Sequence, residues 1–157
     1  MIVQTSPPER IALVDQTHYE TQELCSDGSF IRNIRAQLED LRTTTGVETS
    51  LRISYVWPPS VPVAVADNVT AIVSEALTMI RAHGVATRVE IYLGADVDGA
   101  FLVLMEDGKW SPWSRRVPEQ SAPVWAIQER AARLASYVEV IESEGKGSKL
   151  RVVLPPW

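Results

Sequence analysis

The sequence is poor in cysteine, histidine and positive charge. Its 157 residues include one cysteine, Cys25, and two histidines, His18 and His83. A single cysteine cannot form an internal disulfide, and two histidines this far apart lack the spacing of metal ligands, so we expect no metal site. The formal net charge of −5 argues against a broad nucleic-acid-binding surface and against a polybasic membrane patch.

Long apolar runs are absent as well. No run of the sequence approaches the roughly 18 apolar residues that are needed to span a bilayer. The first residues, MIVQTSPPER, lack the basic and apolar segments of a signal peptide. These features predict a cytoplasmic protein without an inserted membrane segment.

What the sequence does contain is an ordered series of helical and strand-like patterns. Apolar residues at helical spacing predict helices over residues 30–45, 63–83 and 124–137. Alternating apolar and polar residues predict strands over residues 49–56, 87–93, 100–106, 137–143 and 149–155. This order predicts an α+β fold, in which one sheet carries its helices on one face.

The domain organisation follows from the same patterns. A weaker helical pattern over residues 8–25 comes before a polar break, so we expect an N-terminal helical extension over residues 1–28. The remaining residues, 29–157, are enough for one domain with a real core.

Three blocks of the sequence resemble the ATP-binding domain of histidine kinases, whose fold is shared with gyrase and MutL. The first is EALT at 75–78, followed by His83-Gly84 and ATRVEIYL. The second is Glu106-Asp107-Gly108, and the third is AIQERAARL followed by YVEVIESEGKGSKLRVVLP. The resemblance covers residues 29–155 and implies the Bergerat-type fold: a two-layer sandwich with helices on one face of a mixed, mostly antiparallel sheet.

In active members of this family, the glutamate of the first block orients the reacting group. An asparagine four residues later holds Mg²⁺, and residues at this spacing share one helix face. Glu75 keeps the first position, but Met79 stands at the second, and a thioether is a poor ligand for Mg²⁺. We expect Met79 to be a core residue, and the resemblance implies that it also fills the space where Mg²⁺ and phosphate would lie. Glu75 either faces the pocket or is solvated.

The second block normally begins with an aspartate that accepts the adenine amino group and ends with a glycine that lets the backbone approach the nucleotide. Here Glu106 takes the first position, Gly108 is kept, and Trp110 replaces the last glycine. Trp113 and Trp125 lie nearby in the sequence. These tryptophans either fill the vacated pocket or form a binding surface for a protein or an aromatic ligand.

The third block normally offers glycine N–H groups at a helix N-terminus, where they cradle phosphate. Here SAPVWAIQER contains no glycine, and Pro123 removes one N–H donor. The final glycine motif is kept as Gly145, Gly147 and Ser148. His18 lacks the sequence context of a phosphoacceptor histidine.

The resemblance therefore implies a scaffold that fits the family and nucleotide contacts that do not. We expect a degenerate histidine kinase-like ATPase domain, a pseudokinase that needs no cofactor and acts by protein–protein contact in two-component signalling. The expected partners are a kinase, a response regulator or a transcription factor, with homodimerisation as a further option. One alternative is a divergent ATP- and Mg²⁺-binding kinase domain of sensor-kinase or anti-sigma-factor type. Another is a remodelled pocket for a different small ligand.

Overall fold

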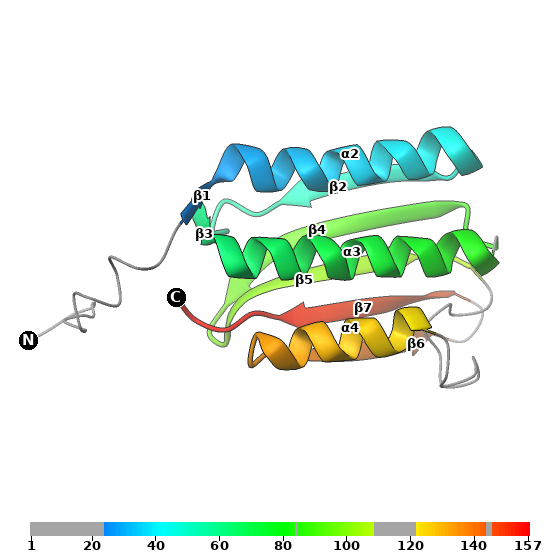
Figure 1. Cartoon of the computed structure of the whole chain (residues 1–157). Helices are drawn as coiled ribbons and strands as arrows, with labels where there is room; N and C mark the ends of the chain where they lie inside the picture. Colours follow the sequence, from blue (N-terminus) through cyan, green and yellow to red (C-terminus); the bar gives the residue numbers. More distant parts are fainter. Residues whose placement is uncertain (1–23, 84, 109–121, 144–145) are drawn as a thin grey trace, which may run out of the picture.

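Three helices lie over one face of a five-stranded sheet (Figure 1). The computed structural model describes residues 24–83, 85–108, 122–143 and 146–157. Its helices are α2 (Asp27–Thr45), α3 (Val63–His83) and α4 (Ala122–Arg133). Its strands are β1 (Leu24–Ser26), β2 (Glu48–Ile53), β3 (Ser60–Pro62), β4 (Arg88–Asp96), β5 (Gly99–Glu106), β6 (Tyr137–Ser143) and β7 (Gly147–Val153). The predicted α+β, two-layer architecture is confirmed.

The large sheet has the strand order β2-β4-β5-β7-β6. Strands β2 and β4 are parallel, and the other neighbours are antiparallel, so the sheet is mixed and mostly antiparallel. The register places Glu106 of β5 opposite Ser148 of β7. Two blocks 42 residues apart in the sequence therefore meet at one end of the sheet.

Helix α3 is the centre of the core. It begins and ends where the sequence predicts, because Pro62 precedes its first residue and Gly84 follows its last. Its predicted apolar face is buried, at Val65, Val69, Ile72, Val73, Ala76, Leu77 and Ile80. α3 is also the one helix among the described residues that is long and apolar enough to cross a membrane, and half of that stretch is buried inside the domain.

The region before α3 differs from the prediction. β2 ends at Ile53 instead of continuing to residue 56, because the Trp57 N–H donates to the Ser54 carbonyl (3.0 Å) and turns the chain. Tyr55, which falls within the predicted strand, lies beyond the end of β2 and is exposed. The proline-rich stretch that follows is not irregular throughout, since β3 pairs with β1 in a small antiparallel sheet.

Helix α4 is also shorter than predicted. It ends at Arg133, and Ala135 takes a φ of 51°, which is the left-handed conformation that usually falls to glycine. The Ser136 N–H then donates to the Ala131 carbonyl (2.9 Å), as in a Schellman cap. Tyr137 therefore starts β6 and is not helical.

The predicted boundary at residue 28 remains a prediction. Residues 1–23 lie outside the described residues, and β1 occupies the last part of the predicted extension. α2 begins at Asp27, so its first turn spans the proposed boundary.

Candidate functional site

The corner between the end of β5 and the start of β7 brings Glu106 and Ser148 together. The Glu106 carboxylate is almost fully buried, with 5% of the residue exposed. Its Oε2 accepts hydrogen bonds from the Ser148 N–H (2.8 Å) and the Ser148 hydroxyl (3.0 Å). Its Oε1 accepts one from the Gly108 N–H (3.2 Å). Both carboxylate oxygens are thus engaged within the domain.

The electrostatics of Glu106 are dominated by burial. Removal of the carboxylate from water raises its pKa, since the charged form loses solvation. The hydrogen bonds from Ser148 and Gly108 favour the charged form and offset part of this rise, while the neighbouring charge of Asp107 adds to it. Glu106 is therefore a buried carboxylate held by neutral donors, without an ion-pair partner among the described residues.

Gly147 allows the two strands to approach at this corner. Its φ is +98°, and a Cβ there would lie 2.0 Å from the carbonyl oxygen of Glu106. Gly108 is similarly tight, because a Cβ would lie 2.8 Å from Glu106 Oε1. The resemblance implies nucleotide contact for both glycines, and the structure gives each a packing role at the same corner.

Asp107 has a role that the sequence analysis missed. Its carboxylate accepts from the N–H (2.7 Å) and hydroxyl (2.5 Å) of Thr87 and from the Arg88 N–H (2.9 Å). Burial alone would raise the pKa of Asp107, but these hydrogen bonds outweigh it and lower the pKa. Asp107 thus ties the end of β5 to the start of β4. An acidic residue directly after a strand was the only sequence signal for this clamp.

Helix α3 places Met79 in the core. Only 2% of Met79 is exposed, and the residue belongs to the main apolar cluster. Glu75, one turn earlier, is half-buried. Within the described ranges, no three His, Cys, Asp or Glu side chains lie close enough together to hold a metal ion. The residues on this helix do not fit a hard cation that needs several oxygen ligands.

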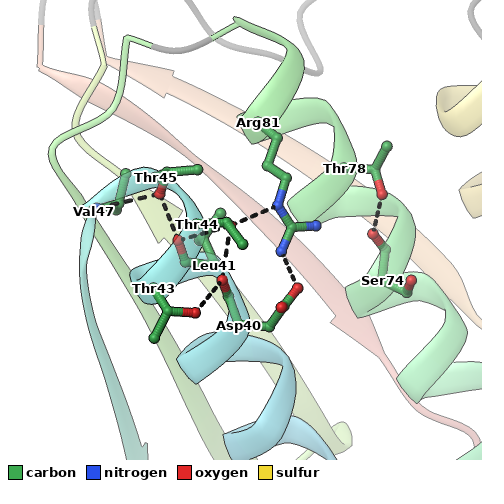
Figure 2. Close-up of polar contacts among 9 residues, drawn as sticks. All are labelled: Asp40, Leu41, Thr43, Thr44, Thr45, Val47, Ser74, Thr78 and Arg81. Carbon is green, nitrogen blue, oxygen red and sulfur yellow. Dashed lines mark hydrogen bonds and ion pairs between the residues drawn. The ribbon is translucent and has the colours of Figure 1, made fainter.

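The side chain of Arg81, also on α3, points away from the apolar core. Figure 2 shows Arg81 reaching from α3 to α2, where its Nη2 lies 2.5 Å from the Asp40 carboxylate. A shallow cavity of about 280 Å³ lies beside this pair, lined by Asn33, Ala36, Gln37, Asp40, Ser74, Leu77 and Arg81. None of the predicted site residues lines this cavity, so it is separate from the Glu106 corner.

Comparison with known proteins identifies the architecture. No family model matches the sequence. The solved ATP-binding domain of PrrB from Mycobacterium tuberculosis superposes with a TM-score of 0.66 at 17% identity, over 87% of this chain and 98% of that domain. The catalytic domain of the histidine kinase ThkA gives a TM-score of 0.65 at 9% identity, over 85% of this chain and 96% of that domain. The fold is that of a histidine kinase ATPase domain.

A curated protein that is similar in sequence comes from Bacillus subtilis. The sensor histidine kinase LiaS is 32% identical over 91 residues, which are 58% of this chain and 25% of LiaS. The chain thus matches about a quarter of the length of that relative. The predicted resemblance is confirmed at the level of fold, and the predicted loss of activity remains a prediction.

Part of the predicted site lies outside the described residues. Trp110, Trp113 and Gly145 fall in this category, as does His18. Pro123 lies in the first turn of α4, where its missing N–H would be unpaired in any case. The structure therefore brings together Glu106, Gly108, Gly147 and Ser148, and places Glu75 and Met79 on α3.

Proposed function

We propose that this domain is a non-catalytic signalling module that binds ATP weakly or not at all. The observation that carries the proposal is Met79, a buried thioether at the position where the family pattern has the oxygen ligand of Mg²⁺. Mg²⁺ requires near-octahedral oxygen ligands and does not accept a buried thioether in their place. A nucleotide held without its metal would leave the phosphate charge uncompensated.

The state of Glu106 supports the same proposal. An adenine amino group needs an acceptor that is free to take its hydrogen bond. Both oxygens of Glu106 already accept bonds from Ser148 and Gly108, so a base would have to use the remaining lone pair of an almost fully buried carboxylate or displace one of these donors. Displacement would cost about 1–3 kcal/mol, because a buried donor would lose its acceptor, and this cost would weaken binding.

The partners in this proposal are proteins of two-component signalling. A kinase, a response regulator or a transcription factor would use the domain as a docking surface in the cytoplasm. This part rests on the histidine kinase-type fold and on the likeness to a segment of a sensor histidine kinase, which spans a quarter of that relative.

A second candidate function is a divergent ATP-binding kinase domain. One observation favours it: a carboxylate and a hydroxyl, Glu106 and Ser148, still sit together at the corner where the family pattern has its adenine acceptor. In that case other groups would replace the missing metal ligand.

Titration of the purified protein with Mg-ATP separates the two candidates. A ligand at 100 times its Kd adds roughly 2.7 kcal/mol of stability to a protein that binds it only when folded. We expect no Mg²⁺-dependent shift in melting temperature or tryptophan fluorescence up to millimolar Mg-ATP. A saturable, Mg²⁺-dependent shift would favour the kinase. If the wild-type protein shows no shift, Met79→Asn alone should not create ATP binding, because Glu106, Trp110 and Pro123 are unchanged.

A further inference from the structure

Strand β6 forms one outer edge of the sheet and carries exposed apolar side chains. Strand β7 pairs with it from Tyr137↔Val153 to Ser143↔Gly147, and no other described strand pairs with it. Tyr137 is 51% exposed, Val140 42% and Ile141 46%. Because side chains alternate along a strand, Val140 lies on one face of the sheet and the other two lie on the opposite face. Apolar surface therefore wraps around this edge.

The opposite edge of the sheet, β2, carries charges of both signs. Helix α2 packs against β2, as α4 packs against β6, so helix packing does not distinguish the two edges. In β2, Glu48 pairs with Arg88 (3.1 Å), and Arg52 pairs with Glu90 (2.5 Å). Charged side chains on an edge strand, lysine above all, are a usual defence against pairing with another chain. The β6 sequence, YVEVIES, has no lysine, arginine or proline, and its two charged residues are Glu139 and Glu142.

The charge of Glu139, in the middle of β6, is neutralised from the next strand. Arg151 of β7 lies opposite it in the register, with its Nη1 at 3.4 Å from the Glu139 carboxylate. Arg151 also pairs with Asp96 (3.1 Å) and lies over the Phe101 ring. The charge of Glu139 is thus compensated within the sheet, so that the edge presents apolar residues beside a paired carboxylate.

We propose that β6 pairs antiparallel with β6 of a second copy of this chain and extends the sheet across the two domains. A two-fold axis perpendicular to the sheet keeps both helix layers on the same side, so each residue pairs with one that faces the same way. Centring the axis on Glu139 would set two carboxylates opposite each other, which destabilises a strand pair. Centring it on Val140 pairs Val140 with its own copy and sets Glu139 opposite Ile141, without like charges in contact. The strand is therefore self-complementary in this register.

The dimer should be weak and reversible. The contact consists of the backbone hydrogen bonds of a seven-residue strand and three apolar side chains from each copy. Such a contact buries a smaller area than the roughly 1,600 Å² of a standard protein–protein interface. We therefore expect a dimer dissociation constant on the order of 100 μM. The inference does not depend on whether the domain binds nucleotide.

Sedimentation velocity of the whole chain, from about 10 μM to 1 mM, tests the proposal. We expect a concentration-dependent dimer, and a Kd raised about tenfold or more by Val140→Lys, since a charge on an edge strand opposes pairing. Val97→Lys is the matched control, because Val97 is 101% exposed in the turn between β4 and β5. A wild-type chain that stays monomeric at 1 mM, or a dimer unaffected by Val140→Lys, would overturn the proposal.

Cysteine cross-linking tests the register independently of any effect on folding. In a Cys25→Ser background, Val140→Cys should form a disulfide-linked dimer under mild oxidation, because directly opposed Cβ atoms lie about 4.5–5.5 Å apart. Val97→Cys should not. Equal cross-linking of both variants, or none at position 140, would contradict the Val140-centred pairing.

Discussion

The Glu106 corner and the Met79 position of α3 are the two parts of the candidate site, and they differ in chemistry. The corner is polar: a buried carboxylate, a serine and two tightly packed glycines meet there. Met79 belongs to the apolar core. Under the proposed function, the Glu106 corner keeps the polar chemistry of the family pattern, whereas the Met79 position replaces a metal ligand with packing.

This difference shows that the two parts of the candidate site carry unequal weight. Met79 packs in the core, so the fold does not require an oxygen ligand at this position. The Glu106 corner joins β5 to β7, and its hydrogen bonds stabilise the fold. Under the proposed function, the polar residues at the corner are therefore weaker support for nucleotide binding than Met79 is against it.

The largest effect is expected from Gly147→Ala. A Cβ at this position would lie 2.0 Å from the Glu106 carbonyl oxygen and would also occupy a backbone with φ +98°. Strain and overpacking together should lower the free energy of unfolding by about 3–5 kcal/mol, measured by urea denaturation. Gly46→Ala is the control, because Gly46 has φ +79° but nothing within 4 Å of the added Cβ. It should cost only about 1–2 kcal/mol. Equal losses of unfolding free energy in the two variants would show that the Glu106 corner can move apart to accept the added Cβ at little cost.

The next effect is expected from Met79→Asn. Placing an amide in the apolar core should lower the free energy of unfolding by about 2–4 kcal/mol. Added Mg²⁺ should restore none of it. Thr78→Asn, on the neighbouring exposed position, should change stability by about 0.5 kcal/mol or less. If 10 mM Mg²⁺ stabilised Met79→Asn alone by about 1 kcal/mol or more, the metal-binding part of the site would be intact apart from one residue.

A pH series should give opposite signs for Glu106→Gln and Asp107→Asn. Burial raises the folded-state pKa of Glu106 above its ordinary value of 4.5, so its stabilising contribution is complete below that pH and is lost as pH rises through the raised pKa. Hydrogen bonds lower the pKa of Asp107 below 3.8, so its contribution is present above that pH and is lost as pH falls through the lowered pKa.

Unfolding free energies measured between about pH 3 and 7 therefore provide the test. The stability advantage of wild type over Glu106→Gln should fall as pH rises, and its advantage over Asp107→Asn should rise. The same slope for both variants would mean that the two carboxylates share one environment.

The smallest effect is expected on the outer side of α3. The Arg81–Asp40 pair joins α3 to α2, but both side chains are partly exposed. Arg81→Ala should therefore cost about 0.2–1 kcal/mol, and less at 1 M NaCl, as measured by thermal unfolding. A loss as large as that of Met79→Asn would erase the distinction between the buried and exposed sides of this helix.

The sequence was most informative where local chemistry marks an element. Helix α3 could be predicted to the residue, because a proline before it and a glycine after it bound a continuous apolar face. The end of α4 could not, because Ala135 adopts a conformation that its residue type does not indicate. Strands β1 and β3 have three residues each, too few for a periodic pattern.

The candidate site was less predictable than the fold. The pairing of Glu106 with Ser148 depends on the register of β5 against β7, and no local pattern specifies it. The resemblance to histidine kinase domains indicated which residues to compare. It did not indicate that both carboxylate oxygens of Glu106 would accept hydrogen bonds from within the domain. The position of β6 at the edge of the sheet could not be predicted either, because an alternating apolar and polar pattern is the same in a central strand and in an edge strand.

Calorimetric titration with ATP, with and without Mg²⁺, tests the central claim most directly. If the metal-binding part of the site is lost, Mg²⁺ should not tighten any residual ATP binding, and Kd should stay above about 1 mM in both conditions. A Kd that falls tenfold or more when Mg²⁺ is added would contradict the account, because it would show that an oxygen-ligated metal still bridges this domain to the phosphates.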